Sequence, residues 1–159
     1  MSRQSRLYLV IALVLAVSLL VGVLAAATSL FGGTGSPSTV PVLGSRSFAQ
    51  PAGVGWGTVE PLEIFNGGDP SGMVVAIDWT GWGTAVAYGY GESSIYEPTG
   101  GYFPGLVKVE LRATTLGHCT AGGPVAYEDL VIREPTRPGG PLGQWSPWGG
   151  SGTTCRAGS

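Results

Sequence analysis

The chain has 159 residues with eight basic and ten acidic side chains, a net charge of −2. From Thr28 onward, six basic side chains face ten acidic ones without forming a basic cluster, which excludes nucleic acid and anionic lipid surfaces as expected partners. That part also holds 27 glycines, a content that disfavours long helices and favours turns.

The N-terminal segment predicts export. Residues 1–6 carry Arg3 and Arg6, and residues 7–27 contain no charge. A helix of that length spans the roughly 30 Å hydrocarbon core of a bilayer, and the preceding positive charges keep the N-terminus in the cytoplasm. We therefore predict a single-pass plasma-membrane anchor with the C-terminal domain outside. The alternative is a secreted protein cleaved near Ala27, because Ala25–Ala27 fit a small-x-small cleavage pattern.

Residues 28–55 read as a flexible linker, because they are rich in Gly, Ser and Pro and lack an apolar period. The extracytoplasmic domain is expected over 56–159, organised around a hairpin at 74–91. In its first arm Val75, Ile77 and Trp79 alternate on one face, residues 80–83 form the turn, and in its second arm tyrosines alternate with Ala and Gly.

Further strands are expected at 62–65, 106–112 and 125–133. The clearest is 106–112, in which Val107, Val109 and Leu111 point inward and three charged residues point to water. From Pro135 the tail is irregular, since each proline removes a backbone donor. The fold class predicted is all-β, a small antiparallel sandwich or barrel of five to seven short strands behind one N-terminal transmembrane helix.

Two cysteines, Cys119 and Cys155, lie on the exported side. In an oxidising compartment an even pair predicts one disulfide, which would pin the tail to the sheet. A reactive thiol is the alternative, but there is no C-x-x-C motif.

No residue pattern selects a catalytic or metal site. His118 beside Cys119 suggests a Cys–His pair only if the cysteine is reduced, and a lone histidine leaves no transition-metal set. Asn66 and Asp69 lie in a glycine-rich turn without calcium-loop spacing. The acidic residues could include a glycosidase pair, but their spacing selects none. We expect no metal and no cofactor.

Aromatic side chains are the better candidates for binding. Tryptophan and tyrosine on a surface stack on sugar rings or on apolar partner surfaces, although in small β-domains they also fill the core. Trp79 follows the inward alternation, whereas Trp82 lies in the turn. The residues predicted as binding contacts are Trp82, Tyr96, Tyr102, Trp145 and Trp148.

One stretch carries a resemblance. The pattern is Ile77-x-Trp79-x-x-Trp82-Gly83 with Gly89-x-Gly91, followed by Val107-x-Val109-x-Leu111, Cys119 and Ala126-Tyr127-x-x-Leu130. It resembles small exported or membrane-anchored proteins of high-GC Gram-positive (actinobacterial) bacteria. The resemblance implies a single exported β-domain and supplies no catalytic residue.

The function predicted is that of a non-enzymatic cell-envelope interaction module whose partner is an envelope protein or a cell-wall polymer. Two alternatives stay open. One is a carboxylate-based glycan hydrolase, which requires two carboxyl groups about 5–10 Å apart in a cleft. The other is a structural subunit of a membrane complex, for which Gly22 and Ala26 offer a small-x-x-x-small helix contact.

Overall fold

The structure is a computed structural model and describes residues 40–156. The predicted cytoplasmic N-terminus (1–6) and membrane anchor (7–27) lie outside the described residues. Within residues 40–156, no helix has the length and apolar character that a membrane span requires.

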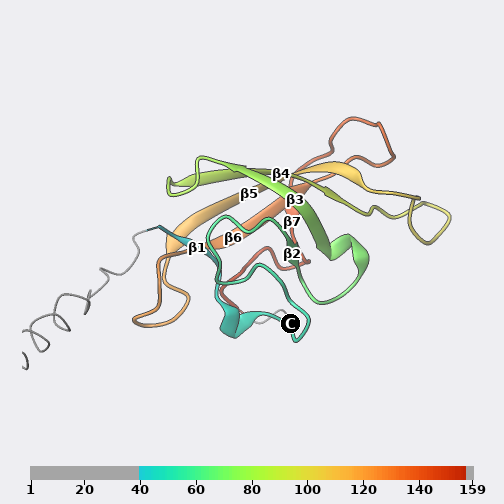
Figure 1. The fold of residues 1–159 in the computed structure, drawn as a ribbon. Helices are drawn as coiled ribbons and strands as arrows, with labels where there is room; N and C mark the ends of the chain where they lie inside the picture. Colours follow the sequence, from blue (N-terminus) through green and yellow to red (C-terminus); the bar gives the residue numbers. More distant parts are fainter. Residues whose placement is uncertain (1–39, 157–159) are drawn as a thin grey trace, which may run out of the picture. The chain divides into compact units, whose positions relative to one another are not determined.

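Seven strands form one sheet in the described region (Figure 1). Across the sheet their order is β1-β6-β5-β4-β3-β2, and β7 pairs with β6 beside β1. Only β1 and β6 run parallel. The strands are β1 (Val42–Leu43), β2 (Ile64–Phe65), β3 (Met73–Thr80), β4 (Val86–Ser93), β5 (Val107–Gly117), β6 (Ala126–Arg133) and β7 (Ser146–Pro147), and two short 3-10 turns are η1 (Arg46–Phe48) and η2 (Pro70–Gly72).

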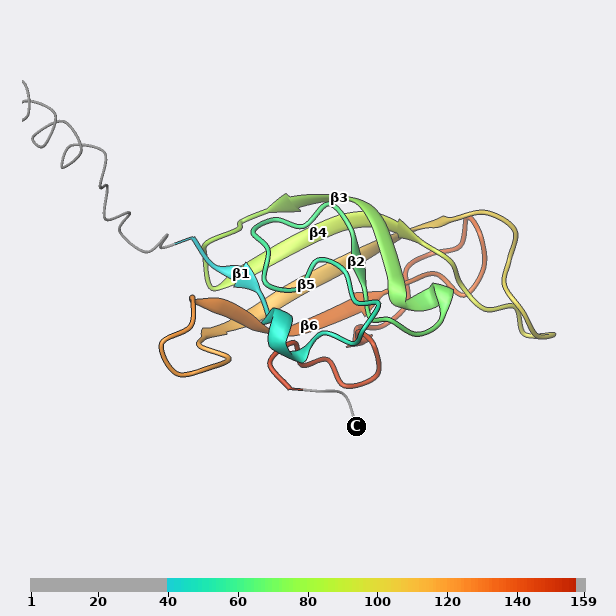
Figure 2. The same ribbon diagram turned by 60° about the horizontal axis from the view of Figure 1, so that its bottom comes forward.

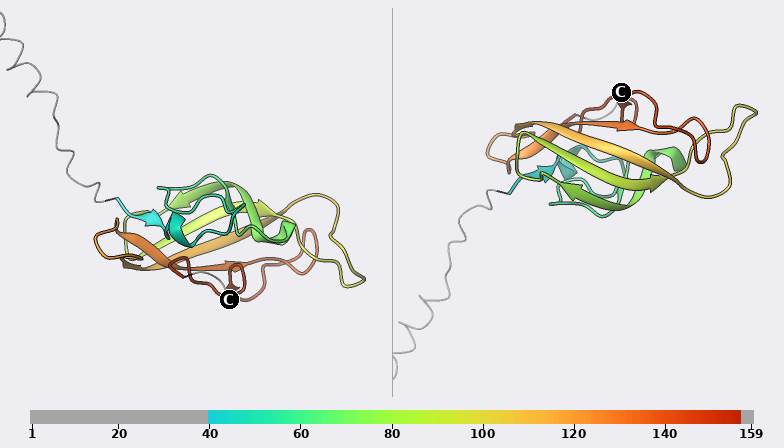
Figure 3. Two further views of the ribbon diagram at one scale, coloured as in Figure 1. Left: turned by 90° about the horizontal axis from the view of Figure 1, so that it is seen from below. Right: turned by 90° about the horizontal axis from the view of Figure 1, so that it is seen from above.

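The sheet curls into an open half-barrel, and the coil between β1 and β2 crosses its concave side (Figures 2 and 3). The all-β class is therefore confirmed. We also expected an antiparallel sandwich or barrel, but the structure has one curled sheet. Coil covers its open side, where a sandwich would place a second sheet. Apolar side chains from β1, this coil and β2, including Leu43, Trp56 and Ile64, complete the core.

The predicted hairpin is present as β3 and β4. In β4 the alternation is as expected: Ala87, Gly89 and Gly91 are buried, whereas Tyr88 and Tyr90 are exposed. The small residues permit close packing of the core against the strand, since a Cβ placed on Gly91 would lie only 2.8 Å from a side-chain carbon of β3.

The inward face of β3 differs from the prediction. Val74 and Ile77 are the buried residues, whereas the alternation assigned Val75 and Ile77 to one face. A bulge between Val75 and Asp78, with Ala76 at φ +52°, inserts one residue and lets positions three apart face the core.

The outer face of β5 is partly covered. Its inward residues are the predicted Val107, Val109 and Leu111. Lys108 is exposed, but Glu110 and Arg112 are half-buried, although we expected all three charged residues to point to water. The tail places Trp145 against this face, where the guanidinium groups of Arg112 and Arg133 lie 4.8 and 4.9 Å from its ring centroid.

The linker predicted for 28–55 overlaps the folded part of the chain. Val42 pairs with Ala126 in the parallel β1–β6 contact, and Leu43 is fully buried in the core. Because the preceding residues are rich in Gly, Ser and Pro, the sequence pattern placed this short apolar strand in the linker. The domain therefore includes β1 and η1, and it begins before residue 56.

Tyr127 joins the tip of the β3–β4 hairpin to the core. Its side chain is fully buried, its hydroxyl donates to the carbonyl of Thr84 at 2.6 Å, and it accepts from the amide of Gly83 at 2.9 Å. Trp82 packs edge-on against the Tyr127 ring with centroids 5.0 Å apart. The hairpin tip is thus a fixed part of the domain.

Candidate functional site

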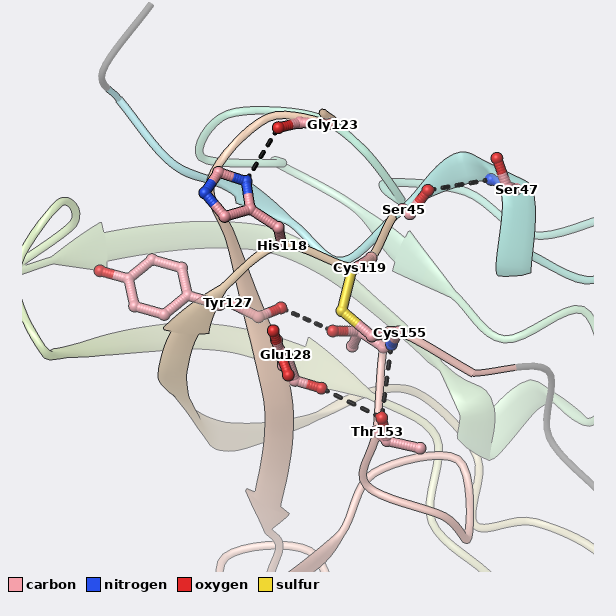
Figure 4. The surroundings of a disulfide bond; sticks show 10 residues. Ser45, Ser47, His118, Cys119, Gly123, Tyr127, Glu128, Thr153 and Cys155 are labelled. Atoms are coloured by element: carbon pink, nitrogen blue, oxygen red, sulfur yellow. Dashed lines mark hydrogen bonds between the residues drawn. A yellow bond between two sulfur atoms is a disulfide. The ribbon is translucent and has the colours of Figure 1, made fainter. Parts of the chain in front are cut away.

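The C-terminal tail is held along β6 by backbone hydrogen bonds and by the predicted disulfide. Cys119, in the loop after β5, is bonded to Cys155 in the tail (Figure 4). Beside it the Thr154 hydroxyl donates to the Tyr127 carbonyl at 2.6 Å, and the Thr154 amide donates to the Glu128 carbonyl at 2.7 Å. The prediction of a disulfide that pins the tail is confirmed.

His118 takes no part in a Cys–His pair. Figure 4 shows its imidazole turned away from the disulfide, with Nδ1 2.8 Å from the carbonyl oxygen of Gly123. Because Cys119 is oxidised, it offers no thiolate as a nucleophile.

The structure places three of the five predicted contact residues in packing roles. Trp82 is half-buried between Trp79 and Tyr127, and its indole N–H donates to the carbonyl of Pro41 at 2.8 Å. Trp145 lies against two arginines on the outer face of the sheet. Trp148 is only 4% exposed and packs against Trp56.

Tyr96 and Tyr102 form a stacked pair in which Tyr96 is exposed and Tyr102 is half-buried. Their ring centroids are 4.4 Å apart with an interplanar angle of 28°, and Tyr96 is 52% exposed. The Tyr96 hydroxyl donates to the Asp69 carboxylate at 3.1 Å, which links the pair to the start of η2. Of the predicted contacts, these two residues combine aromatic surface with a fixed orientation.

The stacked pair lies at one end of a groove formed by two adjoining hollows. The first, of about 410 Å³, is lined by Tyr96 and Asp69 and by residues of the tail. The second, of about 240 Å³, lies between the tail and the coil around Trp56. Both hollows are lined by Asn66, Gly68, Trp148 and Gly149. We call the two together the tail groove, because the tail supplies one of its walls.

The tail groove carries two carboxyl groups at its larger end. Asp69 and Glu134 both line the 410 Å³ hollow. Burial raises the pKa of the half-buried Glu134 carboxyl above its ordinary value. The Tyr102 hydroxyl, with a smaller effect of Asp69, raises the pKa of Tyr96 to about 12. Arg156 lines the smaller hollow at the opposite end.

One buried donor in the wall lacks a partner. The indole nitrogen of Trp148 is enclosed, yet no hydrogen-bond acceptor for it lies among residues 40–156. An unpaired buried donor costs about 1–3 kcal/mol, so such groups are rare in folded proteins. No cluster of three or more His, Cys, Asp or Glu side chains suited to a metal ion occurs in this part of the chain.

Sequence reasoning missed the composition of this groove. Asn66 and Asp69 were noted only as a turn, and Glu134 was one acid among ten. The signal for Tyr96 and Tyr102 was their position in the glycine- and proline-rich loop between β4 and β5, which the structure closes with an isolated bridge between the two residues. The convergence of η2, this loop and the tail is tertiary and leaves no local pattern.

Comparison with known proteins found no match: no family model, no curated protein and no solved structure is similar to this chain. The tail groove is therefore the basis for the proposed function.

Proposed function

We propose that this protein is a non-enzymatic interaction module of the cell envelope, held outside the plasma membrane by residues 7–27. The uncharged 21-residue segment supports the anchor, and the resemblance to exported proteins of high-GC Gram-positive bacteria supports the compartment. Cleavage near Ala27 would instead release the same domain as a secreted protein. The N-terminal residue of the mature protein, determined by mass spectrometry, distinguishes the two forms.

The observation that carries the binding role is Tyr96, which is exposed, stacks on Tyr102 and lines the end of the tail groove. Aromatic rings that are fixed in place offer contact area with little loss of conformational entropy on binding. Here the stacking and the hydrogen bond to Asp69 fix the Tyr96 ring before any ligand arrives. A partner protein or a wall polymer is the ligand class that suits an extracytoplasmic site.

Sedimentation of the full-length protein with insoluble envelope tests this role. The protein, purified in a mild detergent, is mixed with wall material from a high-GC Gram-positive bacterium and pelleted. We expect co-sedimentation that a Tyr96→Ala, Tyr102→Ala variant loses. Tyr88→Ala is the matched control, because Tyr88 is 40% exposed but lines neither hollow. Failure of the native protein to sediment would exclude the proposal.

A second candidate function is the carboxylate-based glycan hydrolase, and one observation favours it: Asp69 and Glu134 line the same hollow. A half-buried carboxyl with a raised pKa is suited to act as a general acid. The two functions separate in one assay, the release of reducing ends from purified wall glycan. If the native protein releases reducing ends and Glu134→Gln abolishes this release, the function is enzymatic and the binding role is wrong.

A further inference from the structure

The polar groups of the tail groove restrict the chemistry of its ligand. Its larger end holds the carboxyl groups of Asp69 and Glu134, whereas its one basic side chain, Arg156, lies at the opposite end. An anionic polymer would meet like charge beside the stacked tyrosines, and like charges at close range are destabilising. The ligand that fits this end carries no negative charge.

The remaining groups at this end suit hydroxyl groups. Asn66, Ser71 and Ser146 line the larger hollow together with the two acids. The Asn66 side-chain oxygen accepts from the Gly68 amide at 2.9 Å, and no acceptor for the Asn66 amide nitrogen occurs among the described residues. Carboxylates accept hydrogen bonds, amides donate them, and serine hydroxyls do both. A hydroxyl group on a ligand can pair with every one of them.

The site consists of two hollows that share lining residues, so it is longer than a single pocket. The larger hollow, at about 410 Å³, falls within the usual 300–1,000 Å³ of ligand sites, and the smaller one shares Asn66 and Gly149 with it and is lined by Trp56. Trp148 lines both hollows, but its indole nitrogen is enclosed, so it offers a ligand ring surface rather than a hydrogen-bond donor. A chain-like ligand uses both hollows, whereas a single small molecule uses one.

From these groups we propose that the tail groove binds a neutral oligosaccharide strand, with one sugar ring stacked on Tyr96 and the strand continuing past Gly68 and Trp148. Sugar C–H groups carry partial positive charge and contact the negative face of an aromatic ring. The ring hydroxyls reach the carboxylates and the amide. This inference rests on the proposed envelope-binding role and specifies the ligand for it.

Direct titration tests the inference independently of envelope binding. The full-length protein in detergent is titrated with three neutral probes, cellohexaose, maltohexaose and chitohexaose, and with polyphosphate as an anionic control, by isothermal calorimetry. We expect at least one neutral probe to bind and polyphosphate not to bind. Tyr96→Ala should weaken binding about tenfold, which corresponds to the loss of one aromatic stacking contact. Tyr88→Ala should stay within twofold of the native protein.

A blocking variant tests the path of the strand. Gly68 is exposed, lines both hollows, and has no positive φ, and a Cβ placed on it meets only the Asn66 side chain at an ordinary 3.4 Å. Gly68→Leu therefore fills the groove without straining the backbone, and it should abolish binding of the hexasaccharide while leaving the unfolding midpoint unchanged. Unchanged affinity of this folded variant would overturn the proposed path.

The two proposals fail in distinguishable ways. If the native protein sediments with envelope in a Tyr96-dependent manner but binds none of the neutral probes, and the probes do not displace it from envelope, the oligosaccharide inference is wrong and the interaction role stands, with a protein as the expected partner. If a neutral probe binds but envelope does not retain the protein, the ligand chemistry stands and the envelope role is wrong.

Discussion

Replacing Tyr127 by Phe isolates the contribution of one buried hydroxyl to the position of the β3–β4 hairpin tip. The hydroxyl makes two hydrogen bonds, to the Thr84 carbonyl at 2.6 Å and from the Gly83 amide at 2.9 Å. Burial raises the pKa of Tyr127, so the hydroxyl keeps its proton and donates at neutral pH. Phenylalanine retains the aromatic ring and its contacts, and the substitution removes only these two bonds.

The expected loss follows from those bonds. Each contributes about 1 kcal/mol net, and no cavity larger than one oxygen atom forms. Gly83 and Thr84 are exposed, so water satisfies part of what they lose. We therefore expect the free energy of unfolding to fall by about 1–2 kcal/mol, which corresponds to roughly 4–8 °C in Tm for a domain of this size.

Urea denaturation of the full-length protein, followed by tryptophan fluorescence, measures this loss. Trp82 packs against the Tyr127 ring, so its emission also reports whether the hairpin tip has moved. Tyr88→Phe is the control, because its side chain is exposed and the change should stay within about 0.5 kcal/mol. A Tyr127→Phe protein as stable as this control would refute the role assigned to the hydroxyl.

Three further predictions concern the tail and the groove. Replacing Cys119 and Cys155 by Ser opens a loop of 36 residues and should lower the free energy of unfolding by about 4 kcal/mol, measured in urea. Trp145→Ala removes two cation–π contacts and should cost about 1–2 kcal/mol in the same assay, without changing sedimentation with envelope. Burial raises the pKa of Glu134 in the folded protein, so the folded state favours the neutral carboxyl. The stabilising effect of this group on the folded state is fully present below the ordinary pKa of about 4.5, and it is lost as the pH rises through the raised pKa. Glu134→Gln should therefore be more stable than the native protein at pH 7 and equal to it at pH 4, by denaturation at each pH.

Each of these predictions has an opposite outcome. Unchanged stability of the Cys→Ser protein would mean that hydrogen bonding alone holds the tail. Loss of envelope sedimentation in Trp145→Ala would return this tryptophan to the binding surface. A stability difference between Glu134→Gln and the native protein that does not vary with pH would mean that ionisation of the carboxyl is not its cause.

The parts of the fold that sequence reasoning predicted are those with a strict two-residue period. Val107, Val109 and Leu111 alternate with charged residues, and the structure buries all three in β5. The small residues of β4 are buried opposite exposed tyrosines for the same reason. In both strands the local pattern and the tertiary contacts agree, so the pattern alone was sufficient.

The differences arise where tertiary contacts override the pattern. The bulge at Ala76 moves the inward position from Val75 to Val74, and a single residue in a left-handed conformation has no clear sequence signal when it is alanine. Trp82 lies in a turn, where exposure is the ordinary expectation, but the carbonyl of Pro41 and the ring of Tyr127 give it buried partners. Neither partner is close to Trp82 in the sequence.

The outer edge of β6 is shared by the two ends of the described chain. Its first residues, Ala126 and Tyr127, pair with β1, and its last, Val131 and Ile132, pair with β7. Strand β1 therefore seals the start of this edge, and β7 with the following tail residues seals the rest, so the edge offers few free backbone donors and acceptors to another molecule. Trimming the chain to residue 44 at one end, or to 145 at the other, would open a template for edge-to-edge aggregation. Fragments of this protein made for biophysical work need both ends to keep this edge covered.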